Sequence, residues 1–154
     1  AQETPKGPER WEKNIAAFLG LPLGGSKVVI GDGPQLPALK TRHPKAHFLG
    51  AKFGEDLARH VAAADVFVFP SLTDTFGLVM LEAMACGLPV AAFPVPGPKD
   101  VVREGEVGAL DWDLGKAIER ALQLPREACR AYAGQFSWEA ATRQFLANLA
   151  PFPT

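Results

Sequence analysis

The sequence has little cysteine, no long apolar run and no excess of either charge. Among its 154 residues only two are cysteine, and 16 basic residues nearly balance 17 acidic ones. Two cysteines are too few for a disulfide scaffold or a four-thiolate zinc site, so we expect Cys86 and Cys129 to be reduced, buried thiols of a cytoplasmic protein. The balanced charge argues against a nucleic-acid-binding domain. No apolar stretch approaches the roughly 20 residues of a transmembrane segment, and the polar start AQETPKGPER lacks a signal-peptide core.

Short runs rich in Val, Ile and Phe alternate with helical patterns along the chain. Apolar residues make up 47% of the sequence, which is enough for the core of one globular domain. The predicted strands are Lys27–Ile30, Ala46–Leu49, Asp65–Phe69 and Pro89–Phe93. The predicted helices are Glu12–Leu19, Glu55–Ala63, Leu78–Cys86, Leu114–Leu124, Arg126–Gly134 and Ser137–Leu149, with a loop over Pro94–Asp100. This alternation predicts an α/β fold with a parallel sheet, whose ligands bind at the carboxyl ends of the strands.

The most informative segment runs from Asp65 to Ala92. It predicts a strand, a polar loop and then a helix that starts near Gly77, where free backbone amides and the helix dipole favour a phosphate. Asp74 and Glu82 are eight residues apart, which on a helix is a rise of about 12 Å with a return to nearly the same face. That spacing is too long for a proton-sharing pair of carboxylates. It suits two hydroxylated rings at opposite ends of a diphosphate.

A purely structural interpretation of the same two acids is also available. Asp74 would cap the helix, and Glu82 would pair with a surface lysine. However, Glu82 interrupts an otherwise apolar helix that we expect to be buried on most faces. A buried carboxylate is costly without a partner, so the pattern favours a ligand-binding role.

The segment resembles the donor-binding signature of retaining glycosyltransferases of family 4, which have the GT-B fold. That signature is an acidic residue, then Gly-Phe-Gly or Thr-Phe-Gly, then an apolar run that ends in Glu-Ala. The sequences EKNIAAFL, VVIGDGP, HFLG and FSW also occur here in that family's order. The resemblance implies the donor-binding, C-terminal half of a GT-B enzyme, with a Rossmann-like sheet and helices on both faces.

The resemblance also implies roles for individual residues. Lys13 would neutralise the leaving diphosphate, and together with Asp74 it would form the catalytic set. Glu82 would bind the nucleotide ribose. The remaining donor-binding positions are Gly31, Gly33, Phe53, Thr75, Phe76, Gly77 and Leu78. The resemblance implies no metal and no cofactor, with the nucleotide sugar as co-substrate.

Two departures from the family pattern affect the expected organisation. The family has a strand before EKN that ends in Gly-Arg, but Pro8 stands at the arginine's place and QETPKG does not have a strand pattern. The first strand of the family is therefore expected to be missing. The N-terminal acceptor domain of the family is likewise expected to be missing from this chain. We expect a polar arm over residues 1–10, a nucleotide-sugar-binding domain over 11–136 and a C-terminal helix and tail over 137–154.

The resemblance implies a hexosyltransferase of the bacterial type that uses a UDP- or GDP-linked sugar. This chain alone is expected to be inactive or nearly so, and peripheral membrane contact is possible in the full enzyme. The alternative is a non-catalytic nucleotide-binding or interaction module that kept the fold. Other candidates are weaker: Pro44 separates His43 from His47, Ser71 lacks a hydrolase elbow, and Trp112 is expected to be a packing residue.

Overall fold

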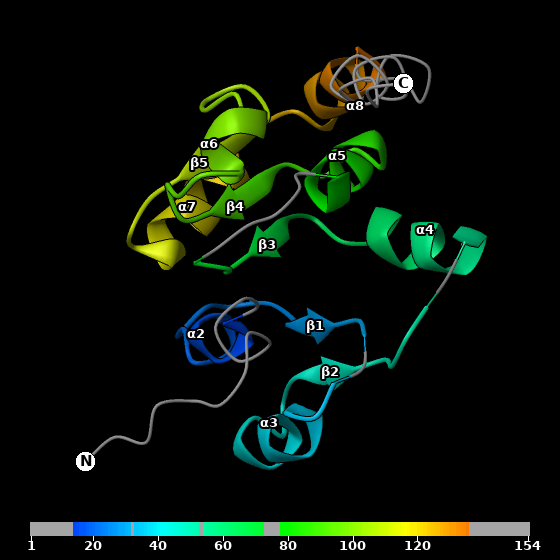
Figure 1. Cartoon of the computed structure of the whole chain (residues 1–154), viewed down its shortest axis with the longest axis vertical. Coiled ribbons are helices and arrows are strands. Elements are labelled where there is room, and N and C mark those ends of the chain that lie inside the picture. The colour runs from blue at the N-terminus through cyan, green and yellow to red at the C-terminus, as the bar shows by residue number, and fades with distance from the viewer. Residues whose placement is uncertain (1–13, 32, 53, 73–77, 136–154) are drawn as a thin grey trace, which may run out of the picture.

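The computed structural model describes residues 14–31, 33–52, 54–72 and 78–135 of the chain (Figure 1). Within these ranges helices and strands alternate, as the sequence predicts. The helices are α2 (Ile15–Leu19), α3 (Leu36–Arg42), α4 (Gly54–Ala62), α5 (Leu78–Ala85), α6 (Pro98–Val101), α7 (Leu114–Ala121) and α8 (Arg126–Gly134). The strands are β1 (Val28–Val29), β2 (His47–Phe48), β3 (Phe67–Phe69), β4 (Val90–Ala92) and β5 (Gly108–Leu110).

The described strands form two sheets in which every pair is parallel. One sheet contains β1 and β2, with Val28 opposite His47. The other has the order β3-β4-β5, with Phe67 opposite Val90 and Val90 opposite Gly108. This arrangement confirms the predicted parallel, Rossmann-like α/β architecture. No helix in the described ranges is long and apolar enough to cross a lipid bilayer.

Strand β4 is fully buried and separates two hydrophobic clusters. Val90 and Ala92 belong to a cluster with Met80 and Met84 of α5, to which α8 also contributes. Ala91 belongs to a second cluster, formed with the buried face of α7. Because successive side chains of a strand point to opposite faces, a strand that is apolar throughout must be covered on both sides. Helices α5 and α8 therefore cover one face of β4, and α7 covers the other.

Three elements were not expected from the sequence. Strand β5 and helix α3 were missed, and the predicted loop over Pro94–Asp100 is wrong where α6 begins at Pro98. Pro98 has the fixed φ that suits a first helical residue, and the Asp100 carboxylate accepts a hydrogen bond from the Gly97 N–H at 3.3 Å. Strand β5 reads Gly-Ala-Leu and contains no β-branched residue, so it lacks the usual strand signal.

Arg126 joins the start of α8 to the end of α4. Its guanidinium donates hydrogen bonds to the backbone carbonyls of Ala62 at 2.8 Å and Ala64 at 2.9 Å. The last carbonyls of a helix have no partner within the helix, so a cation that binds them stabilises the helix end. Arg126 is therefore a tertiary cap for α4.

We predict that Arg126→Ala lowers the free energy of unfolding by about 1–3 kcal/mol, because the carbonyls lose a charged hydrogen-bond donor. Thermal unfolding followed by circular dichroism measures the change. Arg59→Ala is the control, because Arg59 is highly exposed and its ion pair with Glu55 is 4.0 Å long. A shift as small as that of the control would contradict the capping role.

Gly108 is the point of closest approach between β5 and its surroundings. A Cβ at this position would lie 2.5 Å from the Val90 carbonyl oxygen and 2.7 Å from Val102 Cγ1. A Cβ at Gly134, the last residue of α8, would meet nothing within 4 Å. The space for a side chain is therefore filled at Gly108 and open at Gly134.

We predict that Gly108→Ala destabilises the protein by about 1–3 kcal/mol through overpacking, whereas Gly134→Ala is neutral or slightly stabilising. Urea unfolding of the two variants and the parent chain tests this contrast. Equal midpoints for the two variants would show that β5 does not pack against β4 as described.

Candidate functional site

A backbone hydrogen bond links the loops at the carboxyl ends of β1 and β2. The Gly31 N–H donates a hydrogen bond to the Gly50 carbonyl at 2.9 Å. Gly31 has a φ of 134°, a backbone conformation that side chains with a Cβ rarely adopt. The space beside Gly31 and Gly33 is open, because a Cβ at either would meet no atom within 4 Å. Both glycines therefore expose backbone at the edge where ligands of parallel sheets bind.

Helix α5 presents Glu82 to solvent. The buried side of the helix is formed by Met80, Ala83 and Met84, while Glu82 is exposed and Val79 is 40% exposed. The expectation that this helix is buried on most faces is therefore wrong, and the argument from the cost of a buried Glu82 carboxylate does not hold. Among the described residues Glu82 has no ion pair or hydrogen bond, so its carboxylate has no lysine partner there.

The structure describes only part of the predicted site. Gly31 and Gly33 follow β1, Leu78 is the first residue of α5, and Glu82 lies one turn further along that helix. The other predicted site residues lie outside the described ranges: Lys13, Phe53, Asp74, Thr75, Phe76 and Gly77. Their roles stay predictions.

Ser71, which the sequence analysis set aside because it lacks a hydrolase elbow, is a further site candidate. It follows Pro70 at the carboxyl end of β3 and is only 6% exposed. Among the described residues its hydroxyl has no hydrogen-bond partner. A buried hydroxyl normally has a partner, so Ser71 is a potential donor to a ligand at this edge. The only sequence signal was its place directly after a strand.

Trp112 is not the packing residue that the sequence predicted. It follows β5 and is 65% exposed. One face of its ring stacks on Phe93, which follows β4, with centroids 5.9 Å apart and an interplanar angle of 28°. The prediction failed because composition does not reveal which face of a loop aromatic is covered.

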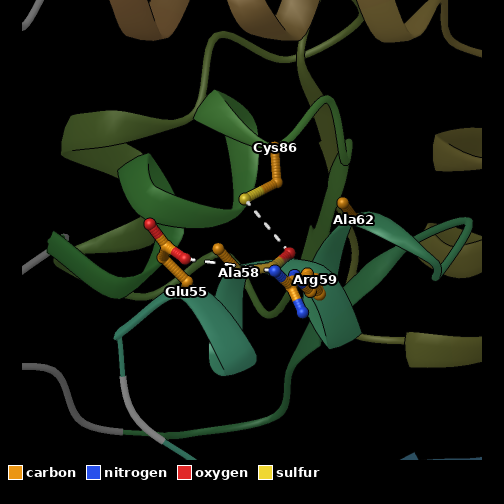
Figure 2. Close-up of a pocket in the computed structure, with 5 residues that line it drawn as sticks. All are labelled: Glu55, Ala58, Arg59, Ala62 and Cys86. Carbon is orange, nitrogen blue, oxygen red and sulfur yellow. Dashed lines mark hydrogen bonds and ion pairs between the residues drawn. The ribbon is translucent and has the colours of Figure 1, made fainter.

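An open groove lies between α4 and the C-terminal end of α5. It has a volume of about 440 Å³ and is lined by Glu55, Ala58, Arg59, Ala62 and Cys86 (Figure 2). The Cys86 thiol lies 4.0 Å from the Ala58 carbonyl oxygen and is half-buried, so the prediction that it is buried is wrong. Of the predicted donor-binding residues that the structure describes, none lines this groove.

The described residues contain no group of three or more His, Cys, Asp or Glu side chains placed to hold a metal ion. His43 and His47 stand on either side of the turn between α3 and β2. They do not form such a group.

Comparison with known proteins identifies the family. Residues 26–124 match the sequence profile of the glycosyl transferases group 1. This chain belongs to that family. It is 39% identical over 101 residues to a GDP-mannose-dependent alpha-mannosyltransferase of Mycobacterium tuberculosis, and 45% identical over 100 residues to a D-inositol 3-phosphate glycosyltransferase of Geodermatophilus obscurus. These matches cover 64% and 60% of the chain but only 27% and 22% of the two relatives. The chain thus spans about a quarter of the length of these relatives.

The solved structures that it resembles have the same fold. Anabaena HepE, crystallised in complex with UDP, superposes with a TM-score of 0.67 over 91% of this chain and 46% of that one, at 23% sequence identity. The GT-B assignment of the fold rests on such structural neighbours.

The two thiols of this chain differ in environment. Cys129 is fully buried, and burial raises the pKa of its thiol, while Arg126 and Arg130 nearby lower it by less. We predict that iodoacetamide at pH 8 alkylates Cys86 at least tenfold faster than Cys129 in the native protein, since reaction requires an accessible thiolate. Peptide mass spectrometry after timed quenching measures both rates. In urea the difference should disappear, and comparable native rates would contradict the burial of Cys129.

Proposed function

We propose that this chain is the donor-binding part of a retaining glycosyltransferase that moves a hexosyl group from a nucleoside diphosphate sugar to an acceptor hydroxyl. Membership of the glycosyl transferases group 1 supports the reaction class. The observation that carries the proposal is the position of Glu82, an exposed carboxylate without a partner among the described residues, on the helix that follows β3. Ligands of parallel sheets bind beside such helices, at the carboxyl ends of the strands.

In this proposal each chemical group of the donor meets a complementary group of the protein. Glu82 accepts hydrogen bonds from the ribose hydroxyls, and the amides at the start of α5 hold the diphosphate together with the helix dipole. Asp74 contacts the transferred sugar. Lys13 neutralises the charge that develops on the leaving diphosphate, which is the main electrostatic task of such a site. Gly31, Gly33 and Phe53 line the nucleotide side.

The nucleotide is UDP or GDP in this proposal. One relative is named as GDP-mannose-dependent, and one structural neighbour was crystallised with UDP. The acceptor site belongs to a further domain, because the chain matches only 27% and 22% of the two relatives. The chain by itself therefore binds the donor but does not transfer the sugar. We further propose that the reaction uses no metal and takes place in the cytoplasm.

A non-catalytic binding module is the second candidate. The observation that favours it is Pro8, which stands where the family has an arginine that grips the diphosphate. A module that lost this arginine and kept Glu82 would bind a nucleoside without activating the diphosphate. Both candidates retain the ribose contact, and they differ in the contribution of the diphosphate to binding.

We predict that Glu82→Ala weakens binding of UDP or GDP by about 10- to 100-fold, since hydrogen bonds to a charged group contribute roughly 1.5–3 kcal/mol. Isothermal titration calorimetry with UDP, GDP, UDP-glucose and GDP-mannose measures the affinities. Glu119→Ala is the matched control, because Glu119 is an exposed glutamate on α7 with no ion pair among the described residues. Equal affinity for the parent chain and the Glu82 variant would contradict the ribose role.

Comparison of the diphosphates with uridine and guanosine separates the two candidates. A donor-binding domain should bind the diphosphate at least tenfold more tightly than the nucleoside. The non-catalytic module should bind both alike.

A further inference from the structure

Trp112 has the largest exposed fraction, 65%, of any large apolar side chain in the described ranges. It lies just beyond β5, and Phe93, on which its ring stacks, directly follows β4. The two aromatic residues therefore occupy the carboxyl ends of neighbouring parallel strands, which is the edge where sheets of this kind bind ligands. An exposed tryptophan leaves a large apolar surface in water, and such a surface is commonly a binding site.

Hydrogen bonds on both sides of Trp112 fix the loop that carries it. The Asp111 N–H donates to the Ala92 carbonyl at 3.1 Å, and the Asp113 N–H donates to the Asp111 carboxylate at 2.8 Å. Asp113 also caps α7, because its carboxylate accepts a hydrogen bond from the Lys116 N–H at 3.3 Å. A side chain on a loop fixed in this way loses little conformational freedom when a ligand binds.

Arg120 of α7 anchors the same loop. Its guanidinium donates to the Leu110 carbonyl at 2.9 Å and to the Asp111 carboxylate at 3.2 Å. These bonds leave acceptor capacity on the loop, because an ionised carboxylate can accept about four hydrogen bonds. The Asp111 side chain is still 34% exposed, and one oxygen of Asp113 has no hydrogen-bond partner among the described residues.

One face of the Trp112 ring is covered and the other is open. Phe93 covers the first face and is itself nearly buried, at 8% exposed. A single open face differs from the cage of several aromatic rings that encloses a quaternary ammonium ion. It suits a ligand that is itself a ring. The π face carries partial negative charge, so it attracts the partially positive C–H groups on the apolar face of a pyranose.

The charges beside the ring distinguish among ring-shaped ligands. Asp111 and Asp113 flank Trp112 directly in the sequence. Carboxylates repel the phosphates of a nucleotide, but they accept strong hydrogen bonds from hydroxyl groups. A neutral sugar has an apolar C–H face and a rim of hydroxyl donors, so it complements both the indole ring and the carboxylates.

We propose that Trp112, backed by Phe93 and flanked by Asp111 and Asp113, is a binding site for the pyranose ring of a neutral saccharide. The sugar ring stacks on the open face of the indole, and its hydroxyls donate to the two carboxylates. This ring belongs to the acceptor glycan, because the donor carries a diphosphate that the acidic loop repels. The assignment to the acceptor rests on the proposed function, whereas saccharide binding does not.

Saturation-transfer difference NMR tests the proposal on the chain without nucleotide, because it detects weak binding of small ligands. The saccharide probes are the methyl glycosides of glucose, mannose and galactose. Uridine and tetramethylammonium chloride are probes for a base site and a cation site. Trp112→Ala and Trp112→Phe are the test variants. Leu122→Ala is the matched control, since Leu122 is also an exposed apolar residue, at 46%.

The parent chain should transfer saturation to at least one glycoside, most strongly to its ring C–H protons. Trp112→Ala should lower this signal by about fivefold or more, Trp112→Phe should retain part of it, and Leu122→Ala should leave it unchanged. Circular dichroism shows whether each variant keeps the fold of the parent.

Three results would overturn the proposal. They are the absence of a signal from every glycoside, equal glycoside signals from the parent and Trp112→Ala, and a signal from uridine or tetramethylammonium alone. No nucleotide is present in this experiment. Its failure therefore leaves the calorimetry on Glu82 intact, and a failure of the calorimetry leaves saccharide binding at Trp112 intact.

Discussion

Burial of β4 on both faces is the constraint on which the rest of the structure depends. A strand whose side chains are all apolar needs a layer of helices on each side. Val90 and Ala92 place α5 and α8 on one face, and Ala91 places α7 on the other. Once Met80 and Met84 are fixed against β4, the helical repeat turns Glu82 toward solvent. The Glu82 carboxylate is thus exposed because the opposite side of α5 packs into the core.

Much of the architecture could be predicted from local patterns. The strands around Val90 and Phe67 are short apolar runs between turn residues, and their alternation with helices predicts a parallel sheet. Strand β5 could not be predicted in this way. The Val90 carbonyl leaves no space for a Cβ at Gly108, and such a tertiary contact cannot be read from the local sequence. Helix α6 begins at a proline within a proline-rich segment, where the sequence signals for a loop and for a helix start coincide.

The sequence predicted the motif residues of the candidate site but not how far their side chains are buried. The spacing of Asp74 and Glu82, together with the neighbouring segments, led to the family that the comparisons show. The burial expected for Glu82 was wrong, because an apolar sequence does not reveal that Val79 and Glu82 share the uncovered side of α5. The exposure of Trp112 was misjudged for a related reason, since it depends on the loops and strands around that residue.

The most direct measurement of the central claim is a crystal structure of the chain with UDP or GDP bound. The account predicts that the ribose hydroxyls lie within hydrogen-bond distance of the Glu82 carboxylate and that the diphosphate meets the backbone amides at the start of α5. A nucleotide bound in the groove beside Cys86, or one that leaves Glu82 facing bulk solvent, would contradict it.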